Sequence, residues 1–222
     1  MDWKKVREDL IRGRPVLIYD LEGREEETDM VFFAGSIDHR SIYELRREAG
    51  GLICYVTSDH VARELGLEFL SDILMKHPLY RELANKRLRY GDMPPYTLYV
   101  NHVKVRTGIS DRDRALTIRE LDKIVDLIEN GRSDLAREIF YRDFVSPGHV
   151  PILIGRSASI RRGHTELSLI VARRAGLRPS MVIAEMLDEG DSMSKDNAIK
   201  YASSRGIIFL EGRDLLREEG VL

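Results

Sequence analysis

The chain has 222 residues, of which 43% are hydrophobic and 32% are charged, and its formal net charge is −2. A chain of this length and apolar content can bury a sizeable core, so we expect a single globular domain over residues 1–222. The nearly balanced charge gives no electrostatic reason to expect binding to nucleic acid or to an anionic membrane.

Cysteine content and hydropathy indicate the compartment. Cys54 is the only cysteine, which excludes an intrachain disulfide and favours a reducing environment. No apolar run approaches the roughly 20 residues that span a bilayer, and no apolar signal-peptide core follows the first residues. We therefore expect a cytoplasmic protein without a membrane partner.

Apolar periodicity predicts strands and helices that alternate irregularly. Short apolar runs predict strands at residues 16–19, 30–33, 52–57, 96–103, 150–154, 181–187 and 207–210. Helical spacing predicts helices at residues 3–11, 38–49, 58–65, 114–130, 133–140, 166–175 and 194–204. Residues 68–95, with a basic segment at 86–89, indicate a surface excursion, and residues 146–149 indicate a turn. This order favours an α/β (α+β-like) fold with a mixed β-sheet core and helices packed around it.

Six acidic residues and Arg24 lie between Asp20 and Asp29, where they separate the first two predicted strands. Like charges this dense repel one another unless a cation or protons compensate them. Glu25, Glu27 and Asp29 alternate, so an extended chain places their carboxylates on one face. Such clusters suit Mg²⁺ or Mn²⁺, whereas the plain alternative is an exposed, solvated acidic hairpin.

A second group of candidates precedes the predicted helix at 166–175. It consists of Arg161, Arg162, Gly163, His164 and Thr165. Thr165 is a candidate N-cap, and arginine beside a helix N-terminus suits a phosphate group. His164 is a candidate metal ligand or proton carrier. The alternative is an ordinary capped helix with surface arginines.

Three further positions are single candidates. His149 precedes the predicted strand at 150–154, where it is either a general base or a hydrogen-bonded structural residue. Glu185 lies within an apolar strand, so it needs either a salt-bridge partner or a function. Thr107 belongs to a small polar loop of a kind that binds phosphate, although ordinary turns use the same residues.

Taken in chain order, these segments resemble the 3,4-dihydroxy-2-butanone 4-phosphate synthase family of riboflavin biosynthesis, in its short single-domain form. The motifs that carry the resemblance are Asp20, Arg24-Glu25-Glu26-Glu27-Thr28-Asp29, Ala49-Gly50-Gly51-Leu52-Ile53-Cys54, Thr107-Gly108-Ile109-Ser110, Asp113-Arg114-Ala115, Thr117-Ile118, Pro147-Gly148-His149-Val150, Arg161 to Glu166, and Glu185. Departures from the family pattern occur at Val145, Ala184 and residues 188–191.

The resemblance implies a lyase that converts ribulose 5-phosphate to 3,4-dihydroxy-2-butanone 4-phosphate and formate, using Mg²⁺ or Mn²⁺. It also implies a homodimer with sites at the subunit interface. By position, Glu25 and His164 would hold the metal, and Asp20 and Cys54 would line the site. Substrate contacts would come from Arg24, Glu25, Asp29, Thr107, Arg161, Arg162, Gly163, His164, Thr165 and Glu185. Proton transfer would involve His149, Glu185, Asp29 and Glu27.

Two other functions use the same residues. A phosphohydrolase could employ the acidic cluster, and a non-catalytic protein could bind a sugar phosphate there. The products separate these alternatives, because a phosphohydrolase releases inorganic phosphate whereas the synthase releases formate and keeps the phosphate ester.

Overall fold

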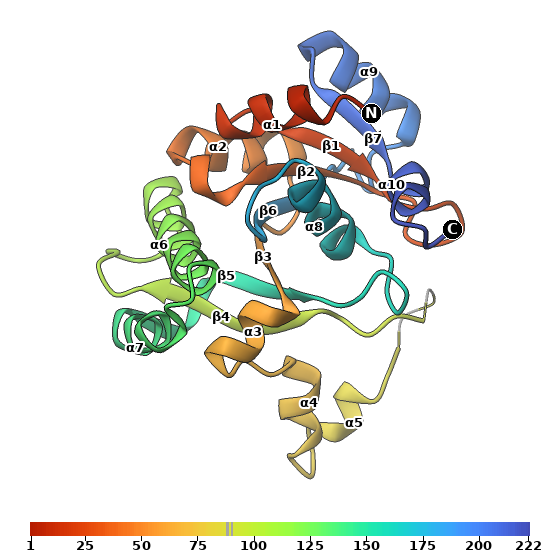
Figure 1. Cartoon of the computed structure of the whole chain (residues 1–222). Helices are drawn as coiled ribbons and strands as arrows, with labels where there is room; N and C mark the ends of the chain where they lie inside the picture. Colours follow the sequence, from red (N-terminus) through yellow and green to blue (C-terminus); the bar gives the residue numbers. More distant parts are fainter. Residues whose placement is uncertain (88, 90) are drawn as a thin grey trace.

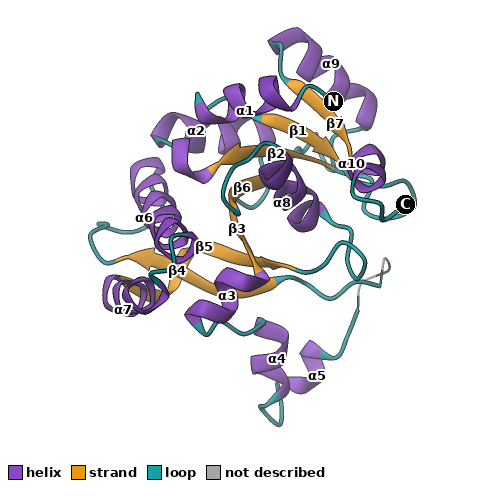
Figure 2. Cartoon of the chain, viewed as in Figure 1, coloured by secondary structure: helices purple, strands orange, loops and turns teal. Residues whose placement is uncertain are grey.

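The computed structural model describes residues 1–87, 89 and 91–222. Within these residues the strands form one seven-stranded sheet in the order β4-β5-β3-β6-β2-β1-β7, with helices on both faces (Figures 1 and 2). The sheet is mixed, because β1 pairs with β7 and β3 pairs with β5 in parallel, while the other neighbours are antiparallel. The predicted mixed sheet with surrounding helices is therefore confirmed.

The elements have the following bounds. The strands are β1 (Val16–Tyr19), β2 (Thr28–Phe33), β3 (Cys54–Ser58), β4 (Tyr96–His102), β5 (Phe144–Gly155), β6 (Ser180–Glu185) and β7 (Ile208–Glu211). The helices are α1 (Trp3–Ile11), α2 (His39–Glu44), α3 (Asp59–Leu65), α4 (Leu70–Met75), α5 (Arg81–Ala84), α6 (Asp111–Glu129), α7 (Ser133–Asp143), α8 (His164–Arg174), α9 (Lys195–Arg205) and α10 (Gly212–Glu218).

Side chains that alternate along the central strands supply two cores, one on each face of the sheet. Met30 and Phe32 of β2 face the core that includes α2, α3, α6 and α7. Val31 and Phe33 face the core formed with α1, α8 and α10. Burial on both faces explains why these strands appear in the sequence as short, continuous apolar runs.

Helix α6 shows how local sequence fixes an element. The Ser110 hydroxyl caps it by accepting a hydrogen bond from the Asp113 N–H, and acidic residues in its first turn favour the helix dipole. Its apolar stripe includes Ile118, Leu121 and Ile124, all buried against the sheet. Burying each such side chain stabilises the fold by about 1.5–3 kcal/mol.

Two predictions about local structure are wrong, and the type of one predicted helix changes along its length. Residues 146–149 do not end an element; they bulge within β5, because Val145 pairs with Asn101 while Val150 pairs with Val100. The helix predicted over 38–49 is present, with Asp38 as its N-cap, but from Leu45 to Ala49 it continues as a π-helical turn. The N-cap of α8 is Gly163 rather than Thr165, so the helix begins at His164.

The region from 68 to 95 and the C-terminus contain helices that the sequence patterns did not predict. Short helices α4 and α5 lie in the expected surface excursion, with no buried residue in either one. The basic segment at 86–89 includes residue 88, which lies outside the described residues. Helix α10 follows β7 directly and buries Leu215 and Leu216 against α8.

None of the helices formed by residues 1–87, 89 and 91–222 combines the length and the apolar character that a membrane crossing needs.

Candidate active site

The acidic turn lies at the end of the sheet where β1 and β6 end and β2 begins. Asp20 directly follows β1, and Asp29 is the second residue of β2. Asp29 pairs with Glu185, the last residue of β6, across the antiparallel ladder. Helix α8 packs against β6 and begins at His164, which brings this histidine to the acids. Strand register therefore assembles residues that are far apart in the sequence.

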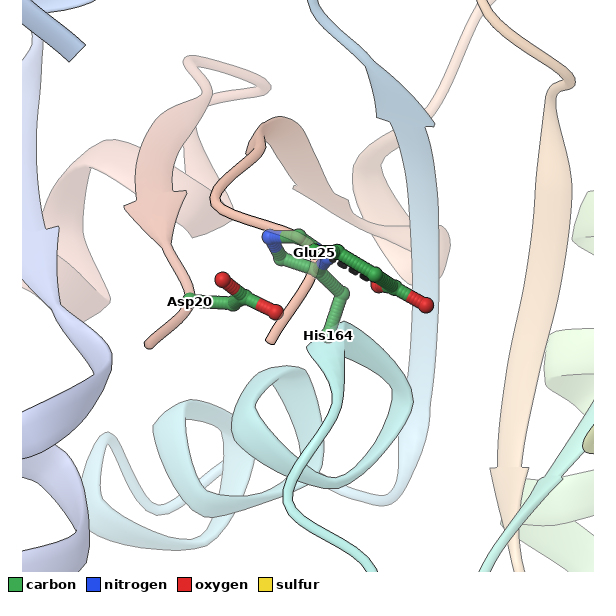
Figure 3. A group of neighbouring side chains, drawn as sticks. All are labelled: Asp20, Glu25 and His164. Carbon is green, nitrogen blue, oxygen red and sulfur yellow. Dashed lines mark ion pairs between the residues drawn. The ribbon is translucent and has the colours of Figure 1, made fainter. Parts of the chain in front are cut away.

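Glu25 and His164 face each other at the centre of this group (Figure 3). His164 Nδ1 lies 3.7 Å from Glu25 Oε2 and 3.4 Å from Asp29 Oδ1. The other ring nitrogen, Nε2, lies 3.2 Å from the backbone carbonyl oxygen of Glu27, to which it donates when protonated. Side-chain ligand atoms of Asp20, Glu25 and His164 all lie within 4.8 Å of one another. Figure 3 shows the imidazole between the two carboxylates.

Arg24 neutralises part of the acidic turn. Its Nη1 donates to Asp20 Oδ2 and to Glu25 Oε2, each at 2.7 Å. Asp20 is satisfied further by backbone N–H groups, because its Oδ1 accepts from Leu21 and from Glu26. Both oxygens of Asp20 are thus engaged within the turn, which makes Asp20 a support for the loop and leaves Glu25 as the better ligand.

Protonation at the centre follows from burial and charge. Burial opposes the charged form of Glu25, but His164 and Arg24 lower the pKa of this carboxyl to about 2. Burial also opposes the charged form of His164, yet the surrounding carboxylates, Asp29 first among them, raise its pKa. Burial raises the pKa of Asp29, and the charge of Glu185 acts in the same direction. Both shifts act in the same direction, because they favour the protonated forms of His164 and Asp29.

These residues fit a divalent cation. Carboxylate oxygen and imidazole nitrogen are common ligands for such ions, and Glu25 presents a charged carboxylate at neutral pH. Asp29 Oδ1 is buried and accepts no hydrogen bond from the residues that the structure describes. His164 would release a proton to become a ligand, so a cation would replace the positive charge that the imidazolium supplies.

A pocket of about 340 Å³ opens beside this centre. The predicted site residues that line it are Glu25, Glu27, Asp29, Arg161, His164, Thr165 and Glu185. Its remaining wall is formed by Pro94, Pro95, Tyr96, Leu153 and Ile183. Glu27 is held by the Ser192 hydroxyl, which donates to its Oε1 at 2.5 Å. The exposed-hairpin interpretation of the acidic turn is therefore wrong, because its alternating acids face a common pocket.

Glu185 is held at the pocket by the backbone of the segment before β3. Its Oε2 accepts a hydrogen bond from the Leu52 N–H at 2.9 Å. A Cβ at Gly51 would lie only 2.2 Å from the same oxygen, so glycine is required for this close approach. Burial raises the pKa of Glu185. No salt bridge to Glu185 is formed among the described residues, which favours a function over the salt-bridge alternative.

Three of the predicted site residues, Gly163, Cys54 and Arg162, do not line the pocket. Gly163 lies under the tips of Arg24 and Arg161, and Cys54 is buried in β3, where burial raises the pKa of its thiol far above the ordinary value. Arg162 is half-buried and does not belong to the described lining of the pocket.

His149 and Thr107 lie in a different place, which we call the Asn101 corner: Asn101, Thr107, Gly108, Asp113 and His149. The His149 N–H donates to Asn101 Oδ1 at 2.9 Å, and the His149 ring lies 3.0 Å from Asn101 Nδ2. Gly108 packs against the Asn101 side chain, and the Thr107 N–H donates to Asp113. Neither His149 nor Thr107 contributes to the described lining of the acidic pocket.

Sequence reasoning missed two residues near the pocket. Asp92 contacts Arg24 and Arg161, but nothing in its neighbourhood marks it in the sequence. Glu166 is buried and accepts from the N–H groups of Arg156 and Gly163 as well as from Arg161 Nη1. A glutamate three residues after a helix N-cap is a known capping signal, and the mistaken N-cap at Thr165 concealed it.

Comparison with known proteins identifies the family. The model of the 3,4-dihydroxy-2-butanone 4-phosphate synthase family matches residues 4–218. The chain belongs to this family. The synthase of Archaeoglobus fulgidus is 39% identical over 214 residues, which cover 92% of this chain and 88% of the relative. The synthase of Methanothermobacter thermautotrophicus is 38% identical over 215 residues, covering 93% and 91%.

Solved structures of the family share the fold. A 3,4-dihydroxy-2-butanone 4-phosphate synthase in complex with two magnesium ions is 26% identical, with a TM-score of 0.75 and coverage of 98% of both chains. These matches confirm the family and the enzyme class that the ordered motifs predicted.

Proposed function

We propose that the chain is a 3,4-dihydroxy-2-butanone 4-phosphate synthase, a cytoplasmic lyase that converts ribulose 5-phosphate to its product and formate. The observation that carries the proposal is the joint lining of one pocket by Glu25, His164 and Glu185 in a member of this family. Proton abstraction beside a ketone needs a base and a positive charge near the developing enediolate. The pocket places both kinds of group around one cavity.

The metal proposal rests on Glu25 and His164, and the magnesium complex of a related synthase supports Mg²⁺. Mn²⁺ accepts the same ligand set. A bound divalent cation would supply Lewis-acid polarisation of substrate oxygens. The chain's own groups would supply the proton transfers: Glu185, Asp29 and Glu27 line the cavity, and burial raises the pKa of the first two, which favours their protonated forms.

Substrate orientation is proposed to depend on the basic side of the pocket. Arg161 lines the cavity beside Thr165, and its guanidinium is held by Glu166 through a hydrogen bond of 2.6 Å. A guanidinium held in this way suits the phosphate of ribulose 5-phosphate, with Arg24, Arg162 and Gly163 close by. Fixing the phosphate at one end aligns the carbon skeleton with the acids at the other.

We propose that a second copy of the chain completes the site. His149 and Thr107 belong to the motifs that carry the family resemblance, yet they lie in the Asn101 corner and do not reach the acidic pocket of their own chain. A symmetric dimer in which each corner meets the partner's pocket would bring them to the substrate. His149 would then act in proton transfer together with Glu185.

The test is incubation with ribulose 5-phosphate and Mg²⁺, with formate and inorganic phosphate measured in parallel. We expect formate without inorganic phosphate, and a chelator should abolish its release. Release of inorganic phosphate would favour a phosphohydrolase, and substrate binding without either product would favour a sugar-phosphate-binding protein.

A further inference from the structure

Asp92, on the segment that precedes β4, forms an ion pair beside the pocket. Its Oδ2 accepts from Nε of Arg24 at 3.1 Å and from Nη2 at 2.9 Å. The same oxygen lies 3.9 Å from Nε of Arg161. One carboxylate oxygen thus faces two arginines that come from different parts of the chain.

The two arginines are more firmly held than the aspartate. Their side chains are 10% and 7% exposed, compared with 27% for Asp92. Asp20 holds Arg24 at 2.7 Å, and Glu166 holds Arg161 at 2.6 Å. Departure of Asp92 would therefore leave both guanidinium groups anchored and positive.

Arg161 has a donor that the carboxylate does not satisfy. Its Nε is buried and has no hydrogen-bond partner among the described residues, since 3.9 Å to Asp92 is too long for a hydrogen bond. A Cβ at Gly163 would lie 2.5 Å from Arg161 Nη1 and 2.6 Å from Arg24 Nη2, so the two guanidinium groups converge above this glycine. One hydrogen-bond acceptor placed between the two guanidinium groups could therefore contact both of them.

A phosphate group matches this arrangement better than a carboxylate. It carries more negative charge and three acceptor oxygens, so it can accept from both arginines at once. Gly163 is also the N-cap of the 11-residue helix α8, whose dipole favours an anion at that end. Asp92 supplies one negative charge to the same arginines when no such ligand is bound.

We propose that Asp92 is an intramolecular competitor for the anionic group of the substrate: its carboxylate occupies the space between Arg24 and Arg161 and must leave when a phosphate binds. Asp92 thereby sets the affinity of the pocket for phosphate esters. The identity of the ester rests on the proposed function, but the competition itself does not.

The experiment measures binding of inorganic phosphate to the full chain by calorimetry, without divalent cations or sugar phosphate. We expect Asp92→Asn and Asp92→Ala each to tighten phosphate binding by about tenfold, because the ligand no longer displaces a charge-assisted hydrogen bond. Asp59→Asn is the matched control, since Asp59 is exposed and pairs with Arg63 on α3, outside the acidic pocket. It should leave phosphate affinity unchanged.

The direction in which phosphate affinity changes shows whether Asp92 competes with the ligand or positions the arginines. Weaker phosphate binding in the Asp92 variants would show that Asp92 positions the arginines, and an affinity equal to the control's would show that it does not meet the ligand. Either result overturns the proposal. A lower KM for ribulose 5-phosphate in Asp92→Asn is the expected counterpart in turnover. Absence of formate would contradict the proposed function while the calorimetric result on Asp92 stands.

Discussion

The acidic pocket and the Asn101 corner satisfy their polar groups in different ways. The pocket is lined by four carboxylates, from Glu25, Glu27, Asp29 and Glu185, but by only one arginine and one histidine among the described residues. In the corner, the Asn101 amide bonds to His149, and Asp113 accepts from backbone N–H groups. The pocket needs added positive charge or protons, whereas the corner is complete as it stands.

This difference indicates which part of the molecule awaits a ligand. Excess carboxylate in a buried space is costly unless a cation, a proton or a substrate compensates it. The hydrogen-bonded Asn101 corner holds His149 in one orientation at the surface, where another molecule can contact it. Substitutions in the pocket should therefore affect turnover more strongly than substitutions in the corner.

Replacement of a proposed metal ligand should have the largest effect. We expect Glu25→Gln and His164→Ala each to reduce formate release by at least about a hundredfold, because the positive charge opposite the developing enediolate is lost. Circular dichroism and thermal unfolding should show an intact fold. Glu22→Gln is the matched control, since Glu22 is an exposed acid of the same turn and lies outside the pocket lining. Near-normal turnover in either ligand variant would refute the metal assignment.

Mixing a variant of the acidic pocket with a variant of the Asn101 corner should restore activity if one site uses residues from both subunits. We expect His149→Ala to lose about a hundredfold in rate, the lower end of the effect of a lost acid–base group. Unfolding and refolding it together with Glu25→Gln should restore about a quarter of wild-type activity, because mixed dimers contain one intact site. If the refolded mixture is as inactive as each variant alone, the site is not shared between subunits. Full activity of a protein that sediments as a monomer would contradict the shared site as well.

Cys54 in β3 should resist alkylation in the folded protein. Its thiol is buried, and its pKa is raised by burial and then by the charges of Glu185 and Asp29. The thiolate is the reactive form, so iodoacetamide should not modify the folded protein at pH 8 but should modify it fully in urea. Modification should accelerate with pH beyond the ordinary thiol range. Rapid labelling of the folded protein at pH 8 would contradict the burial of this thiol.

The smallest effect concerns Asp113 in the corner. Slight burial opposes its charge, but hydrogen bonds from the Gly108, Thr107 and Arg106 N–H groups lower its pKa below the ordinary value. A carboxyl with a lowered folded-state pKa stabilises the fold above its unfolded pKa of about 3.9, and this contribution disappears as the pH falls through the folded-state pKa.

The measurement is urea unfolding of wild type and Asp113→Asn between pH 3 and pH 7. The difference in free energy of unfolding should be greatest at the upper end and should shrink on acidification. If the difference in free energy of unfolding does not depend on pH, the charge of the Asp113 carboxylate does not contribute to stability.

Sequence patterns predicted the strands and long helices well because their periodicity reflects burial directly. The run Met30–Phe33 is buried on both faces, and the α6 stripe matches its buried face. The bulge at 146–149 was mistaken for a turn, because proline and glycine mark any departure from regular pairing. Short helices α4 and α5 bury no residue, so they leave no apolar pattern to detect.

The candidate site was predictable where the motif itself carries the chemistry. Glu25, Glu27 and Asp29 alternate in the sequence, and they line one pocket. Their meeting with Glu185 depends on strand register, which composition does not reveal. Asp92 was missed for the same reason: its contacts with Arg24 and Arg161 arise only from folding. The sequence likewise did not reveal that His149 lies away from the pocket of its own chain.

The direct pairing of Asp29 with Glu185 across β2 and β6 has a consequence for the lifetime of the protein. Two carboxyl groups on facing strand positions repel each other whenever both are ionised, so this pair lowers the stability of the sheet. A ligand that binds only the folded chain offsets this, by about 2.7 kcal/mol at a hundred times its dissociation constant. Because proteases act on opened chains, the supply of cation and sugar phosphate would then govern how much of this protein a cell retains.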